Sequence, residues 1–174
     1  MKRVTVHREA SSDPESIRQV VCAAFSTSDE ADLVESLREN GNLIVSLIAK
    51  DSAGIVGHIG FSPVSIVDGS PLSKKVVGAG LAPISVLPSH QKLGIGSQLV
   101  RAGLDACRDS KIDYVVVLGE PGYYKRFGFE KASELGLKNE YGADSEFRVI
   151  QLSERCLTNV TGIVQFASEF RTFS

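Results

Sequence analysis

Apolar and polar residues alternate along much of the first half of the chain with the two-residue period of strands. Strands are predicted at residues 3–8, 43–50, 55–67 and from 76 to 87. Asp51-Ser52-Ala53-Gly54 separates the second run from the third and is a good hairpin turn, and residues 68–71 form the next turn. The last three strands are therefore expected to form an antiparallel meander.

Three segments show the period of amphipathic helices. The first opens at Asp13-Pro14, where an early proline costs no hydrogen bond, and ends near Phe25. The second begins with Thr27-x-x-Glu30, which fits a capping box, and stops at Asn40-Gly41. The third has apolar residues at 95, 99, 102 and 106 on one face, so its N-terminus lies at the glycines of the preceding turn.

Beyond the third helix, residues 114–118 are apolar at every position. This is typical of a strand covered on both faces and parallel to the strand before the helix, which predicts a right-handed β-α-β unit. Gly119-Glu120-Pro121-Gly122 ends that strand and starts a short helical turn. The remaining segments are predicted as a strand at 127–129, a long surface loop at 133–146, a strand at 147–152 and an extended segment at 163–173.

The turn Gln91-Lys92-Leu93-Gly94-Ile95-Gly96-Ser97 joins an apolar strand to the third helix. A helix N-terminus leaves backbone N–H groups unpaired and carries a partial positive charge, so a diphosphate can bind there. Gly94 and Gly96 carry no Cβ atoms that would keep phosphates from the main chain. A Rossmann fingerprint is excluded because Leu99 stands three residues past Gly96, and the Gly-Lys-Ser/Thr of a Walker loop is absent.

Gln-x-x-Gly-x-Gly directly after a Val-Leu-Pro strand end resembles the cofactor motif of the GCN5-related N-acetyltransferase (GNAT) superfamily. A second match lies downstream, where Tyr124 precedes Gly128-Phe129 as in the family pattern Tyr-x-x-x-Gly-Phe. Together with Gly57-His58 and Phe61-Ser62-Pro63-Val64, these motifs are similar to the YhbS-like branch. The resemblance covers residues 15–152 and implies a single α/β domain over residues 1–174. Its fold would be a mixed central sheet of about seven strands with helices on both faces.

The resemblance implies acetyl-coenzyme A (acetyl-CoA) as the cofactor and no metal. Cofactor contacts are implied for Ile84, Ser85, Val86, Gln91, Lys92, Leu93, Gly94, Ile95, Gly96, Ser97, Tyr123 and Arg126. The amide of Val86 or Leu87 would polarise the thioester carbonyl. Tyr124 would protonate the departing thiolate, since a phenol with a pKa of about 10 stays protonated at neutral pH. Tyr123 is the rival phenol, but the spacing to Gly128-Phe129 favours Tyr124.

The general base is less clearly marked. Glu120 follows the buried strand, at the edge where open α/β sheets gather their sites, and it is the better candidate. His58 lies on an alternating strand, where a histidine is more often structural than basic. Phe25 and Glu30, which flank the acceptor site by resemblance, are expected with His58 to contact the substrate. The alternative for Glu30 is that it only completes the capping box.

Composition excludes several other classes. The 174 residues carry a formal charge of −2 without a dense basic run, which gives no support to nucleic-acid or membrane-surface binding. The start of the chain lacks the continuous apolar core of a signal peptide, so a cytoplasmic location is expected. Cys22, Cys107 and Cys156 are too widely spaced for a zinc site and are expected to be free buried thiols.

The leading hypothesis is an N-acetyltransferase that moves the acetyl group of acetyl-CoA to a primary amine of a small molecule or protein. Two alternatives stay open: a non-catalytic acyl-CoA-binding regulator, and an acyltransferase that uses longer acyl-CoA or acyl carrier protein. The partners expected are acetyl-CoA and an amine acceptor, with a homodimer left open.

Overall fold

The structure is a computed structural model that describes residues 3–69 and 75–172. Its chain divides into two compact units, which are described separately. The first unit comprises Met1–Ser62, Ala82–Ala106 and Ser168–Ser174, and the second comprises Pro63–Leu81 and Cys107–Ala167. Organisation as a single domain stays a prediction.

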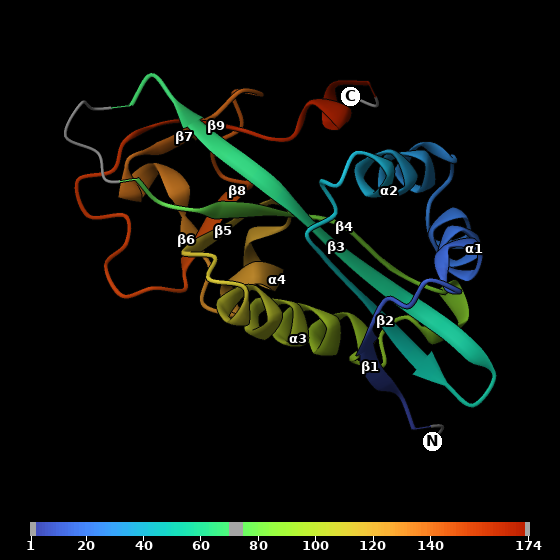
Figure 1. The fold of residues 1–174 in the computed structure, drawn as a ribbon. Coiled ribbons are helices and arrows are strands. Elements are labelled where there is room, and N and C mark those ends of the chain that lie inside the picture. Colours follow the sequence, from blue (N-terminus) through green and yellow to red (C-terminus); the bar gives the residue numbers. More distant parts are fainter. Residues whose placement is uncertain (1–2, 70–74, 173–174) are drawn as a thin grey trace. The chain divides into compact units, whose positions relative to one another are not determined.

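The first unit contains the predicted antiparallel strands. β1 (Thr5–Arg8) pairs with β2 (Val45–Asp51), and β2 pairs with the first part of β3 (Gly54–Val67) (Figure 1). Ile48 lies opposite both His7 and His58 in this ladder. The hairpin between β2 and β3 is therefore confirmed, with its turn at the Asp-Ser-Ala-Gly sequence that predicted it.

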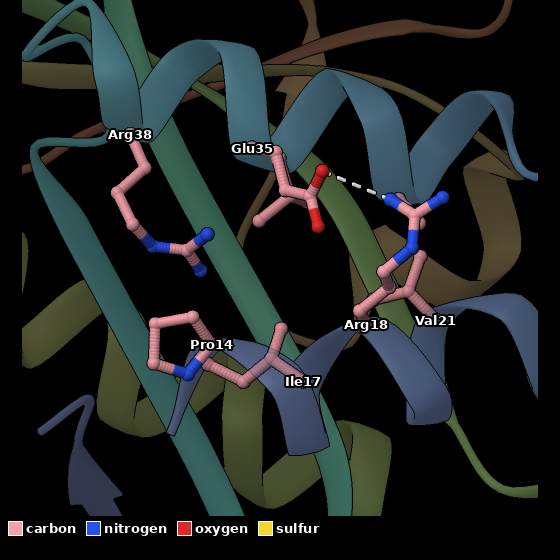
Figure 2. Close-up of a pocket in the computed structure, with 8 residues that line it drawn as sticks. Pro14, Ile17, Arg18, Val21, Glu35 and Arg38 are labelled. Carbon is pink, nitrogen blue, oxygen red and sulfur yellow. Dashed lines mark ion pairs between the residues drawn. The ribbon is translucent and has the colours of Figure 1, made fainter. Parts of the chain in front are cut away.

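Two helices cover one face of these strands. α1 (Pro14–Ala24) and α2 (Asp29–Glu39) bury a shared cluster with Ile48 of β2, formed by Ile17, Val21, Ala31, Val34 and Ile48. Arg18 of α1 reaches across to Glu35 and Asp32 of α2 at 3.0 and 2.9 Å. Figure 2 shows the Arg18–Glu35 pair over the seam between the helices, which has no room for a water molecule. This seam is helix packing and not a ligand pocket.

The opposite face is covered by α3 (Ile95–Asp109), so the first unit has helices on both faces of its strands. Alternate residues of β3 point this way: a Cβ atom at Gly57 would lie 3.0 Å from Leu99, and one at Gly103 would lie 2.5 Å from the ring of Phe61. Phe61 and Leu99 are fully buried. The close approach of α3 to the sheet therefore depends on glycine at position 103.

A turn of 3₁₀ helix, η3 (Ser168–Thr172), joins the first unit from the far end of the chain. Glu169 is buried there and accepts hydrogen bonds at 2.8 Å from the side-chain amides of Asn40 and Asn42, just after α2. Burial alone would raise the pKa of Glu169, but hydrogen bonds to the carboxylate outweigh it and the pKa lies below its ordinary value.

The second unit contains the predicted parallel pair. The first residues of β4 (Gly78–Val86) pair in parallel with β5 (Tyr114–Leu118), and β5 pairs antiparallel with β8 (Phe147–Gln151). β6 (Glu130–Lys131) extends this ladder along β8. β9 (Gly162–Gln165) joins the end of β3 to β7 (Leu137–Asn139).

Nine strands are present in the described residues, against about seven expected, and three segments differ from prediction. Residues 127–129 are not a strand but a turn that closes α4 (Pro121–Lys125), where Gly128 adopts a φ of +98°. The predicted loop at 133–146 contains η2 (Ala132–Leu135) and β7, because Leu137 and Asn139 are buried against β9. The predicted extended end contains β9 followed by η3.

The three cysteines form no disulfide, and Cys107 and Cys156 are buried, as expected, while Cys22 is half-buried. Part of the predicted turn at 68–71 lies outside the described residues. Within residues 3–69 and 75–172, no helix combines the length and apolar character needed to cross a bilayer.

We predict that Gly103→Val destabilises the protein, because the new side chain would overlap the buried ring of Phe61. Overpacking of this kind costs about 1–3 kcal/mol. The free energy of unfolding from urea denaturation measures the loss. Gln98→Val, at an exposed position of the same helix, is the matched control and should change it by less than about 1 kcal/mol. Equal effects of both variants would show that α3 does not pack as described.

Candidate active site

The cofactor strand predicted from the sequence is β4. Its parallel ladder with β5 covers only Gly78–Gly80 and Tyr114–Val116, and β4 continues to Val86. On its other side, the Leu87 amide donates to the carbonyl of Val56 at 2.8 Å. Leu87 therefore has no free N–H and is excluded as the donor to a thioester carbonyl. Because successive N–H groups of a strand point to opposite edges, the amide of Val86 faces away from β3 and remains the candidate.

The turn after β4 has an unusual backbone. It follows a short 3₁₀ helix, η1 (Pro88–His90), and leads directly into α3 at Ile95. Lys92 has a φ of +63° and Gly94 a φ of +84°, both in the left-handed region. A non-glycine residue in this region is strained and persists only where the surroundings hold it. The Gln91 side chain closes the turn by donating to the Val86 carbonyl at 3.1 Å.

The amides of this turn are unpaired. In residues 3–69 and 75–172, no acceptor receives a hydrogen bond from the N–H groups of residues 92–97, and the first bond of α3 runs from Gln98 to Gly94 at 3.1 Å. These donors lie in the first turn of a fifteen-residue helix and just before it, where the helix dipole favours negative charge. The arrangement fits a diphosphate, which can accept several N–H bonds at once.

A second group of predicted residues gathers on α4. Tyr124 is buried, and its ring makes edge-to-face contacts with the rings of Tyr123 at 5.0 Å and Phe129 at 5.5 Å. A Cβ atom at Gly119 would lie 2.3 Å from this ring, so the phenol sits where a side chain at position 119 would be. Tyr123 is half-buried, with the Arg126 guanidinium 4.6 Å above its ring.

Tyr124 stays protonated over the whole working range of pH. Burial, and to a lesser degree the neighbouring Tyr123, raises the pKa of Tyr124 to about 12. In the described chain, its hydroxyl makes no hydrogen bond to another residue. The phenol of Tyr124 therefore keeps its proton at neutral pH, and its role as the acid stays a prediction.

Glu120 has a structural function in the same element. It is the N-cap of α4, and its two carboxylate oxygens accept the amide N–H bonds of Gly122 at 3.0 Å and Tyr123 at 2.6 Å. Both carboxylate oxygens are therefore engaged by amides at the start of α4. The role of Glu120 as general base stays a prediction, and capping already accounts for this side chain.

His58 is fully buried on β3 in the first unit. Its Nε2 lies 2.9 Å from the Ser46 hydroxyl, while Nδ1 has no hydrogen-bond partner among the described residues. Burial, together with the positive charge of Arg38, lowers the pKa of His58 to about 3. An imidazole this weakly basic is a poor proton acceptor at neutral pH, which argues against His58 as the base. Its contact with substrate stays a prediction.

The other predicted acceptor residues flank the α1–α2 connection. Phe25 packs against the apolar cluster under α1 and α2. The predicted capping box is wrong, because α2 begins at Asp29 with Ser28 as its N-cap and no side-chain cap bond. The carboxylate of Glu30 is thus not used for capping, and its Oε2 is shielded from solvent without a hydrogen-bond partner in the described residues.

The structure places these residues in two groups. Residues 84–86 and 91–97 lie in the first unit with Phe25, Glu30 and His58, whereas Glu120, Tyr123, Tyr124 and Arg126 lie in the second. Sequence analysis missed Gly119 as the residue that makes room for Tyr124, and Ser46 as the partner of His58. In the sequence, Gly119 looks like a residue that merely ends a strand, and nothing marks Ser46. No cluster of three metal-ligating side chains occurs in residues 3–69 and 75–172.

Comparison with known proteins identifies the family. Residues 5–132 match the family described as "Acetyltransferase (GNAT) domain". The chain belongs to the GNAT acetyltransferase family. It is 37% identical to the Escherichia coli N-acetyltransferase YhbS over 163 residues, which covers 92% of this chain and 95% of YhbS.

Solved GNAT structures share the fold. The crystal structure of E. coli YhbS in complex with CoA matches with a TM-score of 0.91 and 32% identity, over 100% of this chain and 95% of that one. A GNAT acetyltransferase from Brucella melitensis in complex with acetyl-CoA matches with a TM-score of 0.78 and 32% identity, over 98% and 99% of the two chains. The expected α/β GNAT fold, a mixed sheet with helices, is thereby confirmed.

We predict that His58→Gln makes folding less sensitive to acid. An unfolded histidine has a pKa near 6.5, while native His58 stays neutral down to about 3, so its contribution is fully present above pH 6.5 and is lost as pH falls. The loss amounts to roughly 1.4 kcal/mol per pH unit below 6.5. Between pH 7.5 and 5, the free energy of unfolding should therefore fall by about 2 kcal/mol less in His58→Gln than in the wild type.

Urea denaturation at the two pH values gives this difference, and other titrating groups cancel in the comparison. His7→Gln, which changes an exposed histidine of β1, should keep the wild-type dependence on pH. An unchanged pH dependence in His58→Gln would mean that His58 is not buried in its neutral form.

Proposed function

We propose that this acetyltransferase moves the acetyl group of acetyl-CoA to a primary amine of a small molecule or protein, by direct attack of the amine on the thioester. The observation that carries the proposal is the set of unpaired amides at residues 92–97 before and within the first turn of α3. The CoA and acetyl-CoA in the two GNAT crystal structures that are 32% identical to this chain support the choice of donor.

The donor would bind mainly through the backbone. Its diphosphate would accept N–H bonds from residues 92–97, and its pantetheine arm would lie along Ile84, Ser85 and Val86. Tyr123 and Arg126 offer an aromatic face and a charge to the nucleotide end. The Val86 amide would donate to the thioester oxygen as it gains charge, a role that needs no side chain.

The proposed chemistry assigns one step to each of these groups. The neutral amine adds to the thioester carbonyl, the C–S bond breaks, and the thiolate takes the proton of Tyr124. With a pKa of about 12, this phenol holds its proton until the thiolate forms. The amine loses its own proton to water or to Glu120, and the phenol is reprotonated from solvent. Phe25, Glu30 and His58 are proposed to contact the acceptor.

A second function is favoured by a specific observation. Neither candidate base is well suited to proton transfer, because Glu120 caps α4 and His58 is buried and neutral. This is compatible with a domain that binds acyl-CoA and regulates a partner without turnover. An acyltransferase for longer acyl chains or acyl carrier protein differs only in the acyl group, and the described residues do not select among these donors.

Calorimetry and a thiol assay separate these functions. We expect CoA to bind the purified protein and acetyl-CoA to release free thiol only when an amine from a panel is present. The panel should contain aminosugars, polyamines, amino acids and lysine peptides. Binding without thiol release on any amine would favour the regulator. Absence of CoA binding would defeat both functions.

Tyr124→Phe is predicted to lower kcat roughly 100-fold, because the thiolate would leave without a proton donor. Tyr123→Phe keeps the ring under Arg126 and should lower kcat by less than about threefold. Thiol release at saturating acetyl-CoA measures both, and Tyr141→Phe, at an exposed position, is the matched control. Equal losses in the Tyr123 and Tyr124 variants would contradict the assignment of the acid.

A further inference from the structure

Asp51 is an unusual residue for the tip of a hairpin, because its side chain is only 1% exposed. Its Oδ1 accepts the amide N–H bonds of Ala53 at 2.7 Å and Gly54 at 3.2 Å, within the turn between β2 and β3. These two bonds fix the orientation of the carboxylate. Its second oxygen, Oδ2, lies 3.1 Å from Nε2 of His90.

His90 ends η1, directly before the turn at residues 91–97. Its Nδ1 lies 2.8 Å from the Ser89 hydroxyl, so both ring nitrogens are engaged. The imidazole borders an open cavity of about 310 Å³, whose wall also includes Asp51, Leu87 and residues of α1. On the side of the cavity the imidazole of His90 lacks packing neighbours among the described residues, so its hydrogen bond to Asp51 fixes its position.

The hairpin thus holds the start of the turn at two points. One is the backbone bond from Leu87 to Val56, and the other is the side-chain contact between His90 and Asp51. Beyond these points the chain enters the strained left-handed conformation at Lys92, and Gly94 is left-handed without strain. Such a backbone needs support on both sides, which α3 provides after Gly94 and the hairpin provides before Gln91.

We propose that His90, held by Asp51, is a positioning residue that keeps the amides of residues 92–97 in the arrangement that receives the diphosphate. The inference rests on the proposed binding of acetyl-CoA. Without the contact, the turn samples other conformations, and the apparent affinity falls by the fraction of time that it spends in the competent one. Because the effect acts on the diphosphate alone, it should leave the thiol arm and the chemical step unchanged.

The test compares His90→Phe, which keeps a ring but loses both hydrogen bonds, with His90→Gln, whose amide can donate to Asp51. Calorimetry uses three ligands: CoA, 3′-dephospho-CoA, which keeps the diphosphate and the adenosine, and pantetheine, which lacks both. We expect His90→Phe to weaken the first two about tenfold, or 1.4 kcal/mol, and pantetheine less than twofold. His90→Gln should recover most of the affinity, and kcat at saturating acetyl-CoA should not change in either variant.

Tryptic cleavage after Lys92 is a readout that needs no ligand. His90→Phe should speed cleavage at this bond several-fold, with other sites unaffected and the thermal midpoint preserved, whereas His7→Phe should behave as wild type in every assay. Unchanged CoA affinity and cleavage in folded His90→Phe would overturn the inference, as would equal weakening of CoA and pantetheine. If the wild type binds no CoA, the proposed function fails and so does the positioning role of His90 for the diphosphate; the cleavage rate then reports only whether His90 holds the turn.

Discussion

The main-chain amides at the start of α3 have no hydrogen-bond acceptor among the described residues, and the proposed cofactor site depends on them. Residues 92–97 leave their N–H groups unpaired where a fifteen-residue helix begins, and the preceding backbone is left-handed at Lys92 and Gly94. Exposed N–H groups at the start of a helix are open to an anion, and a left-handed backbone at a non-glycine residue persists only where its surroundings hold it. Here β4 and η1 lie on one side of the turn and α3 on the other, so the first unit holds these amides in place from both sides.

Sequence analysis found this feature because it depends on local rules. Glycine spacing, the end of an apolar strand and the start of an amphipathic helix are all visible along the chain, and so are the hairpin at Asp51–Gly54 and the buried strand β5. It failed where distant residues decide the outcome. Leu137 and Asn139 read as loop because their burial comes from pairing with β9, and residues 127–129 read as strand although Gly128 turns the chain back onto Tyr124.

The chemical roles divide in the same way. Tyr124 could be selected from its spacing to Gly128-Phe129, but the reason that its ring fits is the bare backbone of Gly119. Glu120 was a candidate because it follows the buried strand, and His58 because it is a titratable residue within an alternating strand. Their environments depend on contacts that the sequence does not display, namely two amides of α4 for Glu120 and full burial against Ser46 for His58. A titratable side chain becomes a catalytic candidate only once its neighbours are known.

The position of Glu169 has a consequence for how the protein folds during synthesis. The last described turn, η3, is part of the first unit and places a carboxylate under Asn40 and Asn42, more than 120 positions earlier in the chain. During synthesis the N-terminal segments emerge first, yet the end of α2 lacks this partner until residues 168–172 have left the ribosome. The first unit therefore cannot reach its final packing in the order of translation, because this contact has to wait for a segment made more than 120 residues later.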